Sequence, residues 1–138
     1  MIVYLDSSVT LLVFLRQTAP PPYWGSWSLA LSSTLLGVEA RRTFHRLRLE
    51  GALDDAGLAQ AEESFGEFES GIELVPVTRQ VTRAASAPFG THVKTLDALH
   101  LATALLLRDA PGLEELQFAT LDVRQAIAAR AAGFSVPG

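Results

Sequence analysis

The stretch IVYLDSS, residues 2–8, sets the first unit of the fold. Residues 2–5 are a short β-branched and aromatic run of the kind that forms a buried strand. The sequence Asp-Ser-Ser at 6–8 follows at once, and these residue types cap the N-termini of helices. The apolar run behind them predicts a helix over roughly 8–16. A buried strand that leads straight into a helix is the repeating unit of α/β proteins.

The same alternation continues along the chain. Three prolines within 17–28 exclude a helix there and mark a connection. Further strands are expected at 29–32, 72–77 and 116–122, with a short edge strand at 134–136, and helices at 34–50, 53–70, 78–86, 95–107 and from 123 to about 133. This order predicts an α/β fold with a mostly parallel sheet of four to five short strands, covered on both faces, in a single domain over 1–138.

Polar residues and glycines are expected to set the helix ends. Ser33, Thr78 and Thr95 each precede a helical run, so they are predicted N-caps. Gly51 and Gly133 follow helical runs and are predicted to end them, because glycine readily adopts the left-handed backbone found at helix C-termini. These boundaries decide which side chains stand at the helix starts.

The composition narrows the class of protein. A chain of 138 residues with 49% hydrophobic and 19% charged residues is expected to be a soluble, cytoplasmic domain, with no membrane span and no signal peptide at its N-terminus. The absence of cysteine excludes a disulfide framework and a thiolate zinc site. A net charge of -4 gives no general basic surface, so any contact with nucleic acid must depend on a local patch.

Four acids fall at strand ends or helix starts. Asp6 follows the first strand, Asp122 follows the strand at 116–122, and Glu39 and Asp97 lie in the early turns of two helices. The ligand crevice of a parallel sheet lies beyond the carboxyl ends of its strands, so these acids are expected to share one rim. Each alone could be a helix cap or a solvated side chain. Together they predict an oxygen site for Mg²⁺ or Mn²⁺, a cation that activates water and neutralises phosphate charge.

Four motifs in order carry a family resemblance. They are YLDSS, SSTLLGVEARRTF, KTLDALHLATAL and FATLD, and the resemblance that they carry covers the chain from Met1 to about Phe134. The set resembles the PIN-domain family, and more narrowly the VapC-type toxins of bacterial toxin–antitoxin pairs. The resemblance implies a PIN-like three-layer α/β/α sandwich and a metal-dependent endoribonuclease. It also implies that the catalytic, metal-holding residues are Asp6, Glu39, Asp97 and Asp122.

The resemblance extends to supporting residues and partners. The polar positions beside the first and last acids fall on Ser7, or alternatively Ser8, and on Thr120. The implied substrate is RNA that is single-stranded or looped. The implied partners are a second copy of the chain in a homodimer and a cognate antitoxin whose C-terminal segment lies in the active-site groove.

The helix that carries Glu39 also carries a run of cations. Arg41, Arg42 and Arg46 could bind RNA phosphates or an acidic antitoxin segment, or they could form an ordinary solvated helix face. The sequence leaves both readings open. His92 and Lys94, which precede the helix of Asp97, could also reach a phosphate.

Two further features have a plainer reading. The aromatic residues Tyr23, Trp24 and Trp27 could stack on bases or anchor a partner, but such loops more often fold onto the core. His100 lies one turn after Asp97 and is expected to be a hydrogen-bonded helix histidine rather than a metal ligand or a base.

Two rival functions remain at this point. The first is a PIN-like module that binds RNA or protein without cleaving it, although a mere binder has no need of mutually repelling carboxylates. The second is a phospho-accepting or phosphatase domain with a nucleophilic aspartate. Phosphatases with such a nucleophile use a second aspartate two residues on, where this chain has Ser8.

Overall fold

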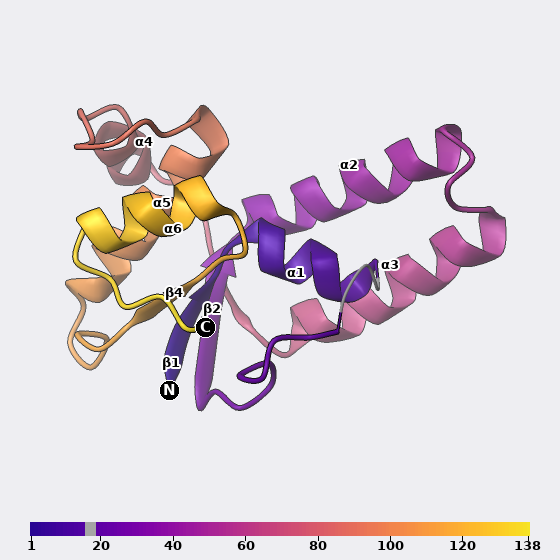
Figure 1. Cartoon of the computed structure of the whole chain (residues 1–138), viewed down its shortest axis with the longest axis horizontal. Coiled ribbons are helices and arrows are strands. Elements are labelled where there is room, and N and C mark those ends of the chain that lie inside the picture. The colour runs from indigo at the N-terminus through magenta and orange to yellow at the C-terminus, as the bar shows by residue number, and fades with distance from the viewer. Residues whose placement is uncertain (16–18) are drawn as a thin grey trace.

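The computed structural model describes residues 1–15 and 19–138. The elements in chain order are β1 (Ile2–Leu5), α1 (Ser7–Phe14), β2 (Leu29–Ser33), α2 (Leu35–Leu49), α3 (Asp55–Ser70), β3 (Glu73–Val75), α4 (Arg79–Ala85), α5 (Thr95–Arg108), β4 (Gln117–Ala119) and α6 (Val123–Ala131). Strands and helices follow one another in the order that the sequence predicts, with two consecutive helices at α2–α3 and again at α4–α5 (Figure 1).

Within the described residues, the strands form one sheet in the order β3-β2-β1-β4, and every pairing is parallel. The chain moves outward from β1 to β2 and β3, and then crosses to the other side of β1 to form β4. The strand order therefore reverses at β1, which is where parallel sheets leave a crevice beyond their carboxyl ends. Asp6 follows β1 at this point.

Both faces of the sheet are covered, because successive side chains of a strand point to opposite sides. Tyr4 of β1 packs with Leu101 of α5 and Ala128 of α6, all of them buried. Its neighbours Val3 and Leu5 pack on the other face with Val9 of α1. The result is the α/β/α layering expected of a PIN-like sandwich.

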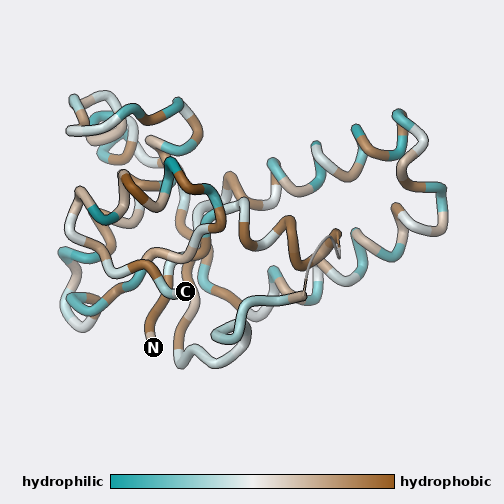
Figure 2. Tube along the Cα trace, viewed as in Figure 1, coloured by the Kyte–Doolittle hydropathy of each residue, from teal (hydrophilic) through white to brown (hydrophobic). Residues whose placement is uncertain are grey.

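Helices α2 and α3 form a hairpin that extends away from the sheet (Figure 1). Figure 2 shows hydrophobic and hydrophilic residues alternating along both helices, as expected for amphipathic helices packed on each other. A separate cluster of Leu36, Ala40, Phe44, Ala61 and Phe65 is buried between them. Leu11 and Phe14 of α1 pack against this cluster, so the hairpin shares its core with α1, and Glu39 lies near the sheet end of α2.

Several predicted boundaries are corrected by the structure. The helix after Lys94 begins at Thr95 itself, so Lys94 is the N-cap and Thr95 is not. Strand β2 extends through Ser33, which moves the next cap to Thr34, although the Ser33 hydroxyl still accepts a hydrogen bond from the Leu35 amide at 3.1 Å. Thr78 does cap α4 as predicted, since its hydroxyl accepts from the Val81 amide.

The strands are shorter than the apolar runs suggest. The run at 72–77 yields only β3, and the run at 116–122 yields only β4, because the chain leaves the sheet at Thr120. Residues 134–136 are not a strand, but the Phe118 amide donates to the Ser135 carbonyl at 2.9 Å, so this segment still lies along the β4 edge.

The ends of the helices are mostly those expected. Gly51 and Gly133 both have positive φ, 80° and 93°, and follow the ends of α2 and α6. The predicted C-terminal end of the first helix, at residue 16, lies outside the described residues, as does part of the proline-rich connection. Among the described residues, no helix is both long enough and apolar enough to cross a membrane.

Candidate active site

Asp6 is the most deeply buried acid of the predicted set. It directly follows β1 and is 1% exposed. Its Oδ2 atom accepts hydrogen bonds from the hydroxyls of Thr120 at 2.7 Å and Ser8 at 2.9 Å. Its Oδ1 atom is also buried but has no hydrogen-bond partner among the described residues. A buried carboxylate oxygen without a donor or cation is unfavourable, so this atom is suited to a ligand.

A network of hydroxyls fixes Asp6 against β4. The hydroxyl oxygens of Ser8 and Thr120, which both donate to Asp6 Oδ2, lie 2.9 Å apart. The Ser8 hydroxyl accepts from the amide of Leu121 at 3.0 Å, and the Thr120 hydroxyl accepts from the amide of Asp122 at 3.1 Å. The contact therefore belongs to Ser8 and Thr120, whereas Ser7, the first choice from the sequence, does not make it. Together these bonds hold the carboxyl ends of β1 and β4 in register.

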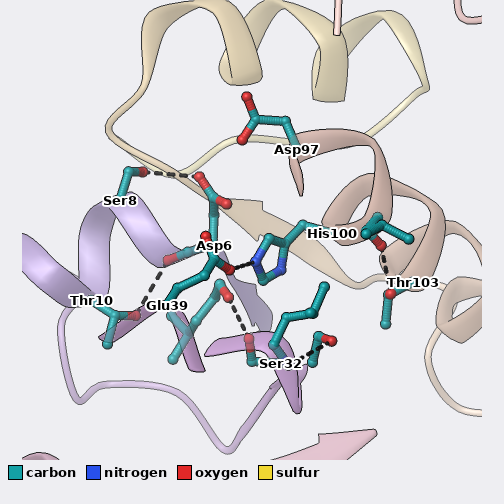
Figure 3. A network of polar contacts seen from close by, with 12 residues as sticks. Asp6, Ser8, Thr10, Ser32, Glu39, Asp97, His100 and Thr103 are labelled. Atoms are coloured by element: carbon teal, nitrogen blue, oxygen red, sulfur yellow. Dashed lines mark hydrogen bonds and ion pairs between the residues drawn. The ribbon is translucent and has the colours of Figure 1, made fainter. Parts of the chain in front are cut away.

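Glu39 is held by a histidine from a different helix (Figure 3). The Nε2 atom of the fully buried His100 lies 2.5 Å from Glu39 Oε1. A carboxylate only accepts, so Nε2–H is the donor. The other ring nitrogen, Nδ1, lies 2.7 Å from the hydroxyl of Tyr4, which is also fully buried. Tyr4 on β1, His100 on α5 and Glu39 on α2 thus form one chain of hydrogen bonds.

The charges around His100 favour its protonated form. Burial by itself lowers the pKa of the imidazole, but the hydrogen bond to Glu39 and the negative charges of Asp6, Glu39 and Asp97 raise it further than burial lowers it. The net pKa is above the ordinary value. The expectation of a hydrogen-bonded helix histidine is confirmed, and the structure adds that its partner is one of the four acids.

Asp97 lies in the first turn of α5, and the charges of the other acids act on its carboxyl group. Its carboxyl pKa is raised, first by partial burial and then by the charges of Asp6 and Asp122, with a smaller contribution from Glu39. The nearby His100 acts in the opposite direction. Asp97 is therefore within electrostatic range of the other three acids.

Helix α6 locks the start of α5 in place. The side-chain amide of Gln125 donates to the backbone carbonyl of Asp97 at 2.9 Å, and Gln125 is 1% exposed. Asp122 is the N-cap of α6, and its Oδ1 accepts from the amides of Arg124 and Gln125 at 2.8 and 3.1 Å. Asp122 is solvent-exposed. The capping role is therefore real, and only its other oxygen remains for a ligand.

The ligand atoms that the four acids offer are of the type that a hard cation prefers. All four acids offer carboxylate oxygens, the ligands that Mg²⁺ and Mn²⁺ prefer, and the unpartnered Asp6 Oδ1 and the raised pKa of Asp97 both indicate a site that positive charge would relieve. Within residues 1–15 and 19–138, however, no three acids or histidines are grouped closely enough to hold a metal ion as they stand. The residues fit such an ion, but the protein alone does not draw them into a closed set of ligands.

Comparison with known proteins places the chain in a family. No family model matches it. It is 31% identical to Ribonuclease VapC45 of Mycobacterium tuberculosis strain CDC 1551 / Oshkosh and, equally, to Ribonuclease VapC49 of strain ATCC 25618 / H37Rv. Each alignment covers 98% of this chain and 94% of the relative. The chain belongs to the VapC family. This confirms the PIN-domain resemblance drawn from the four motifs.

The arginines of α2 are mostly paired with acids of this VapC-family chain itself. Arg41 makes a two-pronged contact with Glu69 of α3 at 2.9 and 3.1 Å, and Arg46 pairs with Glu50 at 3.2 Å. Arg42 is exposed and has no ion pair among the described residues. The prediction that these residues contact RNA or antitoxin remains a prediction, but the pairs favour the reading of a solvated helix face.

The aromatic loop of the VapC-family chain folds inward, as its plainer reading predicts. Tyr23 is 8% exposed. Trp24 stacks on Phe68 of α3 with ring centroids 5.3 Å apart, and Trp27 packs edge-on against Trp24 at 5.1 Å. These side chains close the α1 face of the sheet rather than offering a stacking surface.

Some contributors to the site are not signalled by the sequence. Tyr4 reads as one more residue of a buried strand, and Gln125 as one more residue of a helix. Each acts on an acid through a contact between distant elements. Gln125 is a polar residue at a buried position, and this is the one signal that could have identified it as a contributor to the site.

Proposed function

We propose that this VapC-family chain is an endoribonuclease that depends on Mg²⁺ or Mn²⁺ and acts as the toxin of a type II toxin–antitoxin module. One observation carries the proposal: Asp6, buried and with one carboxylate oxygen unpartnered among the described residues, stands where the strand order reverses, and its charge raises the pKa of Asp97. The two relatives, each named a ribonuclease, support the choice of RNA as substrate.

Each acid has a defined place in this proposal. Asp6, Glu39, Asp97 and Asp122 would hold the cation, some of them through water. When bound, a cation of this kind makes water a better nucleophile and neutralises charge on the phosphodiester. Thr120 and Ser8 donate to Oδ2 and so fix the Asp6 carboxylate, while Oδ1 has no protein partner among the described residues. His100 fixes Glu39, and Tyr4 fixes the His100 ring.

The partners belong to the same proposal. As a VapC toxin, the chain would be neutralised by a cognate antitoxin, would form a homodimer and would work in the cytoplasm. A short reading frame next to this gene that encodes a DNA-binding segment would identify the antitoxin. Co-expression of that frame should relieve the growth arrest that the chain causes alone, whereas arrest that persists would contradict the toxin role.

The activity is tested with one acid-to-amide substitution and its matched control. Asp97→Asn keeps the shape of the side chain but removes the charge, and should lower Mn²⁺-dependent cleavage of a single-stranded RNA by more than about 100-fold, since even outer-shell changes cost 10 to 100-fold. Asp109→Asn is the control, because Asp109 is the exposed C-cap of the same helix, about 18 Å along the axis from Asp97.

Both variants should show the circular dichroism spectrum of the wild-type protein. Full activity of Asp97→Asn with Mg²⁺ or Mn²⁺ present would contradict the assignment. If the wild-type chain binds RNA but neither cleaves it nor binds Mn²⁺ in a calorimetric titration, the rival reading of a non-catalytic binding module is correct instead.

A further inference from the structure

Three basic side chains stand beside the acids. A narrow cleft of about 30 Å³ is lined by Asp97 and Asp122 on the acidic side. His92, Lys94 and Arg124 line the same cleft, together with Gln125. The segment 92–94 and the start of α6 are distant in sequence, so the fold brings these cations together. They form a basic edge to the acidic site, which we call the cation cleft.

The residues of the cation cleft are not used in ion pairs. Across residues 1–15 and 19–138, neither Lys94, His92 nor Arg124 forms a salt bridge with an acid, although two aspartates share the cleft with them. The basic residues of α2 differ, since Arg41, Arg46 and Arg48 each contact a carboxylate at 2.6–3.2 Å. Unpaired cations therefore stand beside the acids in the cation cleft, whereas among the described arginines of α2 only Arg42 is unpaired.

The positions of these cations are unfavourable for the helices that carry them. Lys94 is the N-cap of α5, and Arg124 is in the first turn of α6. A helix N-terminus is the positive end of the helix dipole, where acids are stabilising and cations are not. Helix stability therefore does not explain why lysine and arginine occupy these positions. An anion that binds between the two helix N-termini would explain it.

Two larger hollows share His92 with the cation cleft. The first, of about 290 Å³, is lined by Thr91, His92, Arg124 and Ile127. The second, of about 590 Å³, lies between α4 and the start of α5, and its walls include Phe89, Thr91 and His92. A partly buried aromatic ring and a threonine hydroxyl suit a nucleotide. The cation cleft and the two hollows therefore adjoin at His92, between the acids and the space between α4 and α5.

We propose that these three adjoining hollows form the path of single-stranded RNA across the protein. The phosphate next to the one at the acids lies on Lys94 and Arg124, and the following nucleotide lies in the α4–α5 hollow beyond His92. The identity of the ligand as RNA rests on the proposed function. The site has two unpaired cations followed by a hollow with an aromatic wall. This chemistry suits a phosphodiester with an attached base.

The test measures binding apart from cleavage. A fluorescein-labelled single-stranded oligoribonucleotide is titrated with the full chain in EDTA, and anisotropy is followed over a range of salt concentrations. The double variant Lys94→Ala/Arg124→Ala should bind at least about 10-fold more weakly, with a slope of log K against log[salt] smaller by about 1.4, because each phosphate contact to a single strand contributes about 0.7. Arg46→Ala removes a cation of the α2 face and should change neither quantity.

A second pair of variants tests the hollow. Ala87 lines the α4–α5 hollow and is exposed, so Ala87→Glu adds a negative charge on the path without disturbing the core. It should weaken binding about 10-fold or more. Ala52→Glu adds the same charge at the exposed turn between α2 and α3 and should have no effect. Equal effects of the two would mean that net charge alone governs binding.

The two proposals fail in different ways. Wild-type affinity and slope in the Lys94/Arg124 double variant would overturn the RNA path, even if the wild-type protein cleaves RNA with Mn²⁺. The absence of measurable RNA binding by the wild-type chain in EDTA at low salt would overturn it as well. Binding that depends on the cation cleft, but without any cleavage in Mn²⁺, would support the path and refute the proposed activity.

Discussion

Removing one hydroxyl from the hydrogen-bonded chain behind Glu39 tests how that acid is positioned. Tyr4→Phe keeps the ring, which stacks on Phe118 with centroids 5.3 Å apart. It deletes only the hydroxyl that lies 2.7 Å from His100 Nδ1. Both residues are fully buried, so no water can readily replace the lost partner. His100 would then be held by Glu39 alone.

The expected magnitude follows from leaving a buried nitrogen without a partner. Such a group costs about 1–3 kcal/mol of folding free energy. For a chain of this length, about 3–4 °C of Tm corresponds to each kcal/mol, so Tm should fall by roughly 3–10 °C. Because the His100 ring can turn once Nδ1 is free, Glu39 loses its fixed orientation. Loss of an orienting contact of this type lowers metal affinity or activity by about 10 to 100-fold.

The matched control is the same substitution at the other buried tyrosine. The Tyr23 hydroxyl is buried and has no hydrogen-bond partner among the described residues, so Tyr23→Phe should leave Tm unchanged or slightly higher. Thermal unfolding gives the stability, and calorimetric titration with Mn²⁺ gives the metal affinity. If Tyr4→Phe matched Tyr23→Phe in both measurements, the Tyr4–His100–Glu39 chain would have no part in holding the site.

Three other outcomes follow from the contacts around the acids. Thr120→Val and Ser8→Ala each remove a hydroxyl that holds Asp6 Oδ2 and should lower the cleavage rate by about 10 to 100-fold. Ser7→Ala is the control and should stay within about twofold of the wild-type rate. A larger loss at Ser7 than at Ser8 would reverse the assignment. Mn²⁺ at 100 times its Kd should stabilise the wild-type chain by about 2.7 kcal/mol in thermal unfolding, and Asp6→Asn should show little of this effect. Because the carboxyl pKa of Asp97 is raised above its ordinary 3.8, the folded chain binds the proton more tightly than the unfolded chain, so the metal-free protein loses stability as pH rises from about 4 through that raised pKa. Asp97→Asn should flatten this part of the stability–pH curve, and an unchanged curve would show that Asp97 is not crowded by the other acids.

The sequence was sufficient for the layers of the fold and for the rim on which the acids stand. Strands at 2–5 and 29–32 and their helices follow from local periodicity, which depends only on neighbouring residues. Parallel strands all end on the same side, so Asp6 and Asp122 had to share an edge whatever the strand order. The motifs then identified the family without any coordinates.

Side-chain contacts were harder to predict from the sequence. Ser7 and Ser8 are equivalent as sequence, but successive helix residues point about 100° apart, so only one of them reaches Asp6. The direction is set by how α1 packs on the sheet. In the same way, the acids of α3 lie against the arginines of α2 only because the two helices form a hairpin.

By itself, then, the sequence determined the α/β class and the family and predicted the four acids as the site, because these depend on short-range pattern and on chain order. The tertiary structure alone decided the order β3-β2-β1-β4, the choice of Ser8 over Ser7, and the chain from Tyr4 through His100 to Glu39. It also brought Lys94 and Arg124 to one cleft with Asp97. Each of these joins residues from separate elements, and their distance is set by packing angles that no local pattern encodes.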